Sequence, residues 1–183
     1  KTNVEGTLNI LEASKNLKIK QVLITSTSEV YGTAKKENLK ENDSLVSQSP
    51  YAASKIAADQ FALSYYRSFK LPIKIVRPFN TYGPRQSARA IIPTIITQIL
   101  SGKRELTLGN LNPTRDLTFV TDTCKSFTEI LNNPNFIGQE INVGMNEEIS
   151  IKDLSTLLAN LLNVEVKLKI EKVRVRPDLS EVD

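Results

Sequence analysis

The sequence predicts an α/β fold in which helices cover the faces of a parallel β-sheet. Short runs rich in β-branched residues alternate with longer runs whose apolar residues recur at helical spacing. Strands that alternate with helices typically pair in parallel, because each connection crosses over the sheet. Helices are predicted at residues 4–17, 50–69, 91–100, 121–131 and 150–162. Strands are predicted at residues 20–26, 72–76, 105–108, 114–120, 139–143 and 164–170.

The chain opens with a helix followed by a buried strand. Val4, Leu8 and Leu11 give the first helix one apolar stripe. The run 20–26 is short and β-branched, which is typical of a parallel strand buried on both faces. Hydroxyl side chains follow directly after it, so this strand predicts a polar edge to the sheet.

The longest helix and two loops are expected to meet at that edge. Residues 49–50 are Ser-Pro, and serine suits the N-cap while proline suits the first helical position. Ligands of open parallel sheets bind beyond the carboxyl ends of the strands. We therefore expect residues 25–29, residues 79–85 and the start of helix 50–69 to share one cleft.

Shorter elements fill the second half of the chain, from about residue 91. Pro93 falls in the first turn of the predicted helix 91–100. Ile151, Leu154 and Leu158 are in helical register in the last predicted helix. This half predicts a smaller subdomain that closes over the cleft.

Composition predicts an ordinary folded domain. The 183 residues are 40% hydrophobic and 24% charged, with a net charge of +4. This mild, scattered positive charge does not support a nucleic-acid partner, but it suits an anionic small ligand. No apolar run has membrane-spanning length and no secretory leader is visible, so we expect a cytoplasmic protein without a membrane partner. The single cysteine, Cys124, excludes an internal disulfide.

Histidine is absent from the sequence. This excludes a Ser-His-Asp triad and an HExxH zinc helix, and no metal site is expected. If the protein is an enzyme, its proton transfers depend on Tyr, Lys, Glu or Asp side chains.

Tyr51 and Lys55 are the first candidates for such chemistry. Their four-residue spacing places them on one face of the predicted helix, one turn apart. An ammonium close to a phenol favours the phenolate, so we expect Lys55 to lower the pKa of Tyr51. A phenol with a lowered pKa is a usable general base near neutral pH.

The spacing alone is not specific. Tyr31–Lys35 and Tyr66–Lys70 repeat it in the same sequence. The first of these pairs lies in a polar loop context and the second at the far end of the helix. Only Tyr51 opens a helix that follows a strand ending in hydroxyls.

A nucleotide-binding sheet of the Rossmann type normally begins with a glycine-rich turn, and this chain has none. Its seven glycines are dispersed, and no GxGxxG occurs. We therefore expect the chain to be a fragment that lacks the first strands and their glycine fingerprint.

Five motifs, in order along the whole chain, resemble the extended short-chain dehydrogenase/reductases that act on nucleotide sugars. They are Asn3-Val4-x-Gly6-Thr7, Ser26-Thr27-Ser28-Glu29-Val30-Tyr31-Gly32, Tyr51-x-x-x-Lys55, Arg77-Pro78-Phe79-Asn80-Thr81-Tyr82-Gly83-Pro84-Arg85 and Thr114-Arg115-Asp116. The sequence is most similar to NAD-dependent nucleotide-sugar 4,6-dehydratases, particularly those of legionaminic and related sugar pathways. The resemblance implies a partial Rossmann-like doubly wound sheet at residues 1–90 and an incomplete nucleotide-sugar-binding region at residues 91–183.

The resemblance also implies catalytic roles for individual residues. Tyr51 takes the proton of the sugar 4-hydroxyl, while Lys55 lowers its pKa and holds the nicotinamide ribose. Thr27 hydrogen-bonds the same sugar oxygen. Glu29 removes the proton from carbon 5, which becomes acidic once carbon 4 is a ketone.

The remaining implied residues bind the cofactor NAD or a nucleotide-diphosphate sugar. Asn3 and Thr25 contact the dinucleotide, although Asn3 could instead cap the first helix. Asn80 and Arg85 line the nucleotide-sugar site. Arg115 and Arg176 meet the diphosphate, although Arg115 could instead pair with its neighbour Asp116. The family further implies a homodimer formed through helices 4–17 and 50–69.

One departure from the family pattern leaves the reaction type open. Many dehydratases carry Asp-Glu where this chain has Ser28-Glu29, with the aspartate as acid for the leaving hydroxyl. Serine cannot fill that role directly, so Ser28 requires help from water or from Glu29. Alternatives of the same superfamily are a nucleotide-sugar 4-epimerase and a UDP-glucuronate decarboxylase. An alternative of another class is a non-catalytic fragment or binding module.

Overall fold

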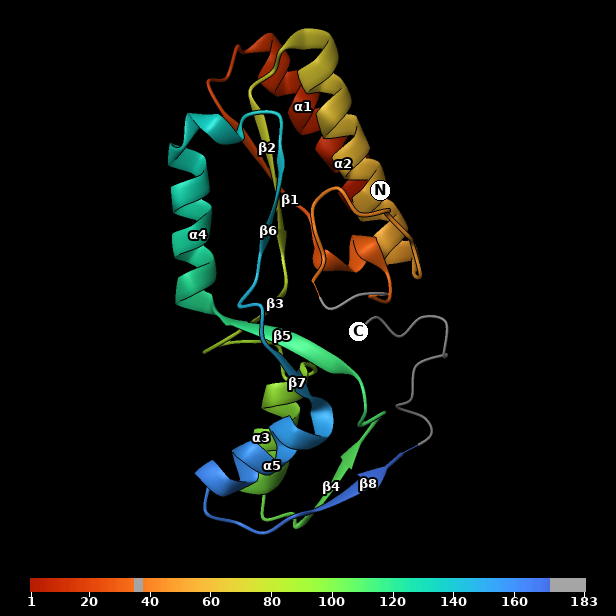
Figure 1. Ribbon diagram of the computed structural model, residues 1–183, viewed down its shortest axis with the longest axis vertical. Helices are drawn as coiled ribbons and strands as arrows, with labels where there is room; N and C mark the ends of the chain where they lie inside the picture. Colours follow the sequence, from red (N-terminus) through yellow and green to blue (C-terminus); the bar gives the residue numbers. More distant parts are fainter. Residues whose placement is uncertain (35–37, 172–183) are drawn as a thin grey trace.

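The computed structural model describes residues 1–34 and 38–171, and it confirms a mixed α/β fold with parallel strands. Figure 1 shows two groups of elements stacked along the long axis of the molecule, with a small sheet between them. In the described residues no helix is both long and apolar enough to cross a membrane.

The first sheet consists of β1 (Val22–Thr25), β2 (Ile73–Pro78) and β6 (Glu140–Val143), in that order and all parallel. Ile24 pairs with Ile75, which in turn pairs with Glu140. The central strand β2 is buried along nearly its whole length, because helices cover both of its faces. The carboxyl ends of these strands point toward the middle of the molecule (Figure 1).

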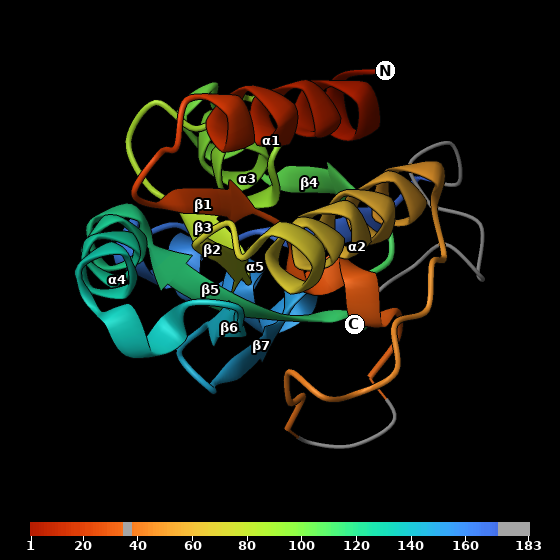
Figure 2. The same cartoon turned by 90° about the horizontal axis from the view of Figure 1, so that it is seen from above.

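Helices α1 (Thr7–Asn16) and α2 (Pro50–Phe69) cover one face of this sheet, and α4 (Val120–Asn132) covers the other (Figures 1 and 2). Alternation along the strands separates the two cores. The first core holds Leu11, Val22, Ile24, Ala62, Leu63, Leu71, Ile73 and Ile75. The second holds Val76, Ile130 and Val143, with Leu23 and Phe127 packed against them.

The second group contains α3 (Ile91–Leu100), α5 (Ile151–Leu161) and the parallel pair β4 (Glu105–Leu108) and β8 (Lys167–Ile170). Its core includes Ile95, Ile99, Leu106, Leu108, Ile151 and Leu154. Between the groups, β5 (Thr114–Phe119) pairs parallel with β3 (Asn80–Tyr82) and antiparallel with β7 (Glu148–Ser150). Residues 120–143 return to the first sheet, so the chain after residue 90 contributes to both groups.

Most predicted elements are present, and the differences lie at short or irregular segments. Residues 2–6 form a π-helix before α1, and residues 28–31 form the short 3₁₀ helix η2 (Ser28–Tyr31). The loop expected at residues 79–85 contains β3, and β7 was not expected at all. Strands of three residues are too short to show a period-two pattern in the sequence. Both β3 and β7 form by pairing with β5.

Candidate active site at the carboxyl edge of the first sheet

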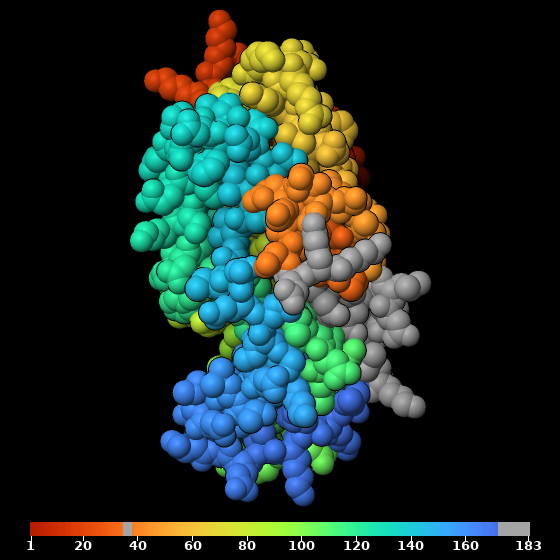
Figure 3. All heavy atoms as spheres, in the orientation of Figure 1, coloured from red at the N-terminus to blue at the C-terminus, as the bar shows by residue number. Residues whose placement is uncertain are grey.

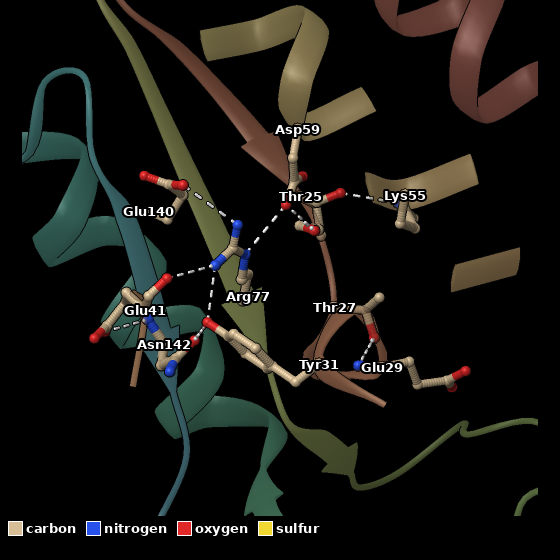
Figure 4. Close-up of polar contacts among 11 residues, drawn as sticks. Thr25, Thr27, Glu29, Tyr31, Glu41, Lys55, Asp59, Arg77, Glu140 and Asn142 are labelled. Carbon is tan, nitrogen blue, oxygen red and sulfur yellow. Dashed lines mark hydrogen bonds and ion pairs between the residues drawn. The ribbon is translucent and has the colours of Figure 1, made fainter. Parts of the chain in front are cut away.

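The start of α2 is fixed against the end of β1. The Ser49 side chain caps α2 by accepting a hydrogen bond from the Ala52 amide at 3.0 Å. Lys55, one turn after Tyr51, donates to the Thr25 carbonyl at 2.9 Å (Figure 4). Its Nζ lies 5.9 Å from the centroid of the Tyr51 ring. The predicted pair therefore stands beside the carboxyl end of the strand, as expected.

The pKa of Tyr51 is raised, not lowered. Burial is the largest cause, the negative charge of Glu29 adds to it, and a hydrogen bond with Thr27 opposes both. The expected lowering by Lys55 is therefore wrong for this structure. Its ammonium is bonded to a backbone carbonyl, while a carboxylate acts on the phenol. Thr27 and Glu29 nevertheless lie close enough to Tyr51 to shift the pKa of its phenol.

Thr27, Ser28 and Glu29 follow β1 in a tight turn. Thr27 is the N-cap of η2, and its Oγ1 accepts a hydrogen bond from the Glu29 amide at 3.3 Å (Figure 4). Ser28 and Glu29 line a cavity of about 290 Å³. Tyr51, beside this turn, is 45% exposed as a residue.

The opposite wall of the cavity comes from β3, β5 and the turn after β6. Asn80, Arg115, Asp116 and Gly144 lie on this wall. Asn80 and Arg115 also line a neighbouring hollow of about 550 Å³. Two adjoining hollows that share these residues make room for an elongated ligand with a polar or anionic centre.

Asp116 organises this wall, a role that sequence reasoning missed. Its carboxylate accepts hydrogen bonds from the amides of Met145 at 2.9 Å and Asn146 at 2.8 Å. A Cβ at Gly144 would lie 2.7 Å from Asp116 Oδ2. Glycine therefore lets the turn approach the carboxylate closely.

The expected single cleft is only partly present, because residues 28–29 and 79–80 line this cavity and no residue of α2 does. Among the predicted binding residues that the structure describes, Asn80 and Arg115 line it, whereas Asn3, Thr25, Tyr51, Lys55 and Arg85 do not. Arg85 lines a separate, largely apolar hollow of about 950 Å³, next to Phe119 and Leu157. The Asn3 side chain donates to Ser54 Oγ at 3.0 Å, so it is fastened to α2 and is not a helix cap. Arg176 lies outside the described residues.

A buried polar network beneath the cavity was also missed. Arg77 and Asp59 are fully buried and form an ion pair at 3.1 Å (Figure 4). Burial raises the pKa of Asp59, and the Ser26 hydroxyl and the Arg77 charge oppose the rise. Asp59 directly follows three apolar residues, 56–58, and this was the available sequence signal for a buried charge.

Comparison with known proteins decides the family. A family model described as GDP-mannose 4,6 dehydratase matches residues 1–182. The chain belongs to this family. The predicted resemblance to nucleotide-sugar dehydratases and epimerases is therefore confirmed.

Relatives in this family include both reaction types. A dTDP-D-glucose 4,6-dehydratase of Dictyostelium discoideum is 36% identical over 170 residues, covering 87% of this chain and 39% of that protein. An uncharacterised UDP-glucose epimerase of Bacillus subtilis is 33% identical over 159 residues, covering 87% of this chain and 50% of that protein.

Solved structures give the same picture. The dTDP-glucose 4,6-dehydratase of Bacillus anthracis in complex with NAD has a TM-score of 0.86 at 33% identity, covering 95% of this chain and 57% of that chain. The UDP-glucuronic acid 4-epimerase of Bacillus cereus, in complex with UDP-glucuronic acid and NAD, has a TM-score of 0.87 at 32% identity, covering 93% of this chain and 54% of that chain. The chain spans about half the length of the family members that it matches.

Proposed function

We propose that the full-length protein is an NAD-dependent nucleotide-sugar 4,6-dehydratase. The reaction would oxidise carbon 4 of the sugar, eliminate water across carbons 5 and 6, and reduce carbon 6, giving a 4-keto-6-deoxy sugar. One observation carries the proposal: Thr27 and Glu29 both act on the Tyr51 phenol, beside a cavity that Glu29 lines. Dehydratases among the relatives and solved structures support it.

The residues at the carboxyl edge of β1 fit the nicotinamide half of NAD. Tyr51 offers a hydroxyl, Lys55 offers an ammonium beside Thr25, and Asn3 lies against Ser54, the residue before Lys55. Dinucleotides bind at this edge in doubly wound sheets. NAD, when bound, supplies an acceptor that takes the hydride from carbon 4 and returns it at carbon 6.

Each catalytic side chain then has a stated task. Tyr51 takes the proton of the 4-hydroxyl, and the Thr27 hydroxyl favours the resulting phenolate. The positive charge of Lys55 stands one turn away on the same helix face. Glu29 removes the carbon-5 proton. Ser28 stands where many dehydratases have an acidic aspartate, so Glu29 or a water must protonate the leaving hydroxyl.

We propose a nucleotide-diphosphate sugar as substrate. Asn80 and Arg115 border both adjoining hollows, and a guanidinium there suits a diphosphate. Arg85 stays a candidate for the nucleotide-sugar site, and Arg176 for the diphosphate. In this proposal residues 1–90 form most of the NAD-binding part and residues 91–183 most of the substrate-binding part, with α4 and β6 returning to the first.

We further propose a cytoplasmic homodimer without a nucleic-acid or membrane partner. Large apolar side chains are exposed on α1 and α2, among them Ile10 at 57%, Phe61 at 37% and Phe69 at 54%. Pairing these helices with those of a second copy would cover them. A monomer measured by light scattering at micromolar concentration would rule the dimer out.

A 4-epimerase is the second candidate. The structural similarity to a UDP-glucuronic acid 4-epimerase and the presence of Ser28 in place of an aspartate favour it. It would use the same oxidation by Tyr51 but no elimination. A UDP-glucuronate decarboxylase is a further candidate, because Ser28 leaves that reaction open too, and a non-catalytic binding module is the candidate of another class.

The reaction products distinguish these functions. The full-length protein is incubated with NAD and a panel of nucleotide hexoses and uronic acids in deuterated water. A dehydratase gives a product that has lost its 6-hydroxyl and carries deuterium at carbon 5. A product that keeps the 6-hydroxyl and lacks deuterium at carbon 5 indicates an epimerase. Carbon dioxide release indicates a decarboxylase, and no turnover of any substrate contradicts an enzymatic function.

A further inference from the structure

One buried guanidinium lies behind the candidate site and contacts several elements at once (Figure 4). Arg77 Nη1 donates to the Tyr31 hydroxyl at 2.8 Å and to the Glu41 carbonyl at 3.3 Å. Its Nε donates to Asp59 Oδ2 at 3.1 Å, and its Nη2 lies 3.4 Å from Glu140 Oε1. A planar guanidinium donates in fixed directions, so it sets the relative position of the groups it bonds.

Tyr31 passes this constraint to the cavity wall. Its hydroxyl accepts from Arg77 and donates to Asn142 Oδ1 at 2.7 Å. This fixes the orientation of the Asn142 amide, whose Nδ2 donates to the Leu39 carbonyl at 3.3 Å. Asn142 and Leu39 both line the cavity with Glu29. Phenylalanine could fill the same space but could not continue the chain of hydrogen bonds.

The loop after residue 38 depends on the same contacts. The backbone amide of Asn142 donates to Glu41 Oε1 at 2.9 Å, and the backbone amide of Val46 donates to the Val30 carbonyl at 2.8 Å. On the surface, this segment (orange) lies against the segment of β6 and the turn after it (light blue), as Figure 3 shows. Tyr31 thus joins the turn that carries Glu29 to this loop.

The helix that carries Tyr51 is anchored by a different branch. Asp59 lies eight positions after Tyr51 on α2, about two helical turns away. Its Oδ2 accepts from the Ser26 hydroxyl at 2.9 Å as well as from Arg77. Loss of the Tyr31 hydroxyl therefore leaves the connection between α2 and the end of β1 in place.

We infer that Tyr31, held by Arg77, is a positioning residue. It fixes the position of Glu29, and of the cavity wall formed by Leu39 and Asn142, relative to Tyr51. The inference deepens the proposed function, because it rests on Glu29 as the base of the elimination. Tyr31 touches no reacting atom; it acts through η2 and Asn142. Its removal is expected to slow the step that needs Glu29 more than the step that needs Tyr51.

The test compares Tyr31→Phe with Tyr65→Phe in the full-length protein. Tyr65 is the matched control, because its hydroxyl also donates to a side chain, Glu12, at 2.7 Å, but at the α1–α2 contact. Tyr31→Phe should raise KM for the nucleotide sugar and slow elimination about tenfold or more, since small misplacements of a base are costly. The reduced nicotinamide should then accumulate and its absorbance should rise, because oxidation of the sugar still proceeds.

Hydrogen–deuterium exchange supplies a second measurement that does not depend on the reaction. Tyr31→Phe should speed exchange in residues 39–46 and 140–143, while α4 stays unchanged. Unchanged protection in both segments, equal slowing of oxidation and elimination, or the same effects in Tyr65→Phe would overturn the inference. If the wild-type protein performs no elimination, the proposed function fails, and the exchange result alone decides whether Tyr31 positions the wall.

Discussion

Tyr51 and Glu29 are electrostatically coupled, because after burial the charge of Glu29 is the next cause that raises the pKa of the phenol. Glu29→Gln should therefore lower the pKa of Tyr51, and Thr27→Val should raise it further. An ultraviolet titration of phenolate formation measures both, with Tyr51→Phe as the reference that lacks this signal. A general base acts deprotonated, so any rate limited by Tyr51 should rise with pH and reach its plateau at lower pH in Glu29→Gln. An unchanged titration in both variants would refute the coupling.

The same substitution separates the steps of the proposed reaction. Glu29→Gln should block elimination but leave the first oxidation, so the reduced nicotinamide and a 4-keto sugar with its 6-hydroxyl accumulate. Loss of a positioned base typically costs roughly two to four orders of magnitude in rate. Tyr51→Phe should instead prevent any rise in the reduced nicotinamide. Rapid-mixing absorbance and mass analysis of the sugar distinguish the two results. Full dehydration by Glu29→Gln would assign the base elsewhere.

The turn opposite Glu29 should tolerate no side chain at residue 144. In Gly144→Ala the new Cβ would meet the Asp116 carboxylate at 2.7 Å and the Phe79 ring at 3.2 Å. Displacing this packed turn should cost about 1–3 kcal/mol of unfolding free energy. KM for the nucleotide sugar should rise as well, because the turn lines the cavity. Denaturant unfolding and steady-state kinetics check the two effects, and wild-type values in both would show that the turn is adaptable.

Lys74 offers a contrast with Arg77 on the same strand. It is fully buried, and its Nζ donates to Gln21 at 2.8 Å and to the carbonyls of Ile130 at 2.9 Å and Leu131 at 2.7 Å. Lys74→Met leaves these carbonyls at the end of α4 without that donor, which should cost about 1–3 kcal/mol of stability.

Chemical denaturation measures the loss in Lys74→Met, and the balance between oxidation and elimination should stay at its wild-type value. A changed balance in Lys74→Met would indicate that any destabilisation of β2 disturbs the site.

Most helices and strands, and the position of Tyr51 and Lys55 beside the end of β1, could be predicted from the sequence because their signals are local. The Tyr51 helix has its cap, its proline and its i, i+4 lysine within one short stretch, and Thr27 and Glu29 follow a strand with a clear pattern. The raised pKa of Tyr51 could not be predicted, since it depends on burial and on the distance to a carboxylate from another element.

The network around Arg77 could not be predicted for a similar reason. Its partners lie 46 residues away at Tyr31 and 63 residues away at Glu140, so only the folded topology brings them together. Likewise β3 and β7 exist because β5 pairs with them.

The return of β6 to the first sheet has a consequence for how the chain folds. Ile75 pairs with Glu140, so β2 keeps an open edge until a segment 65 positions later has been synthesised. A nascent chain that ends near residue 90 would expose the unpaired backbone of a strongly apolar strand and leave Arg77 without Glu140. Such an edge can recruit strands from other chains. Truncation at the apparent boundary between the two groups should therefore yield an aggregating product, whereas inclusion of residues 120–143 should restore a soluble sheet.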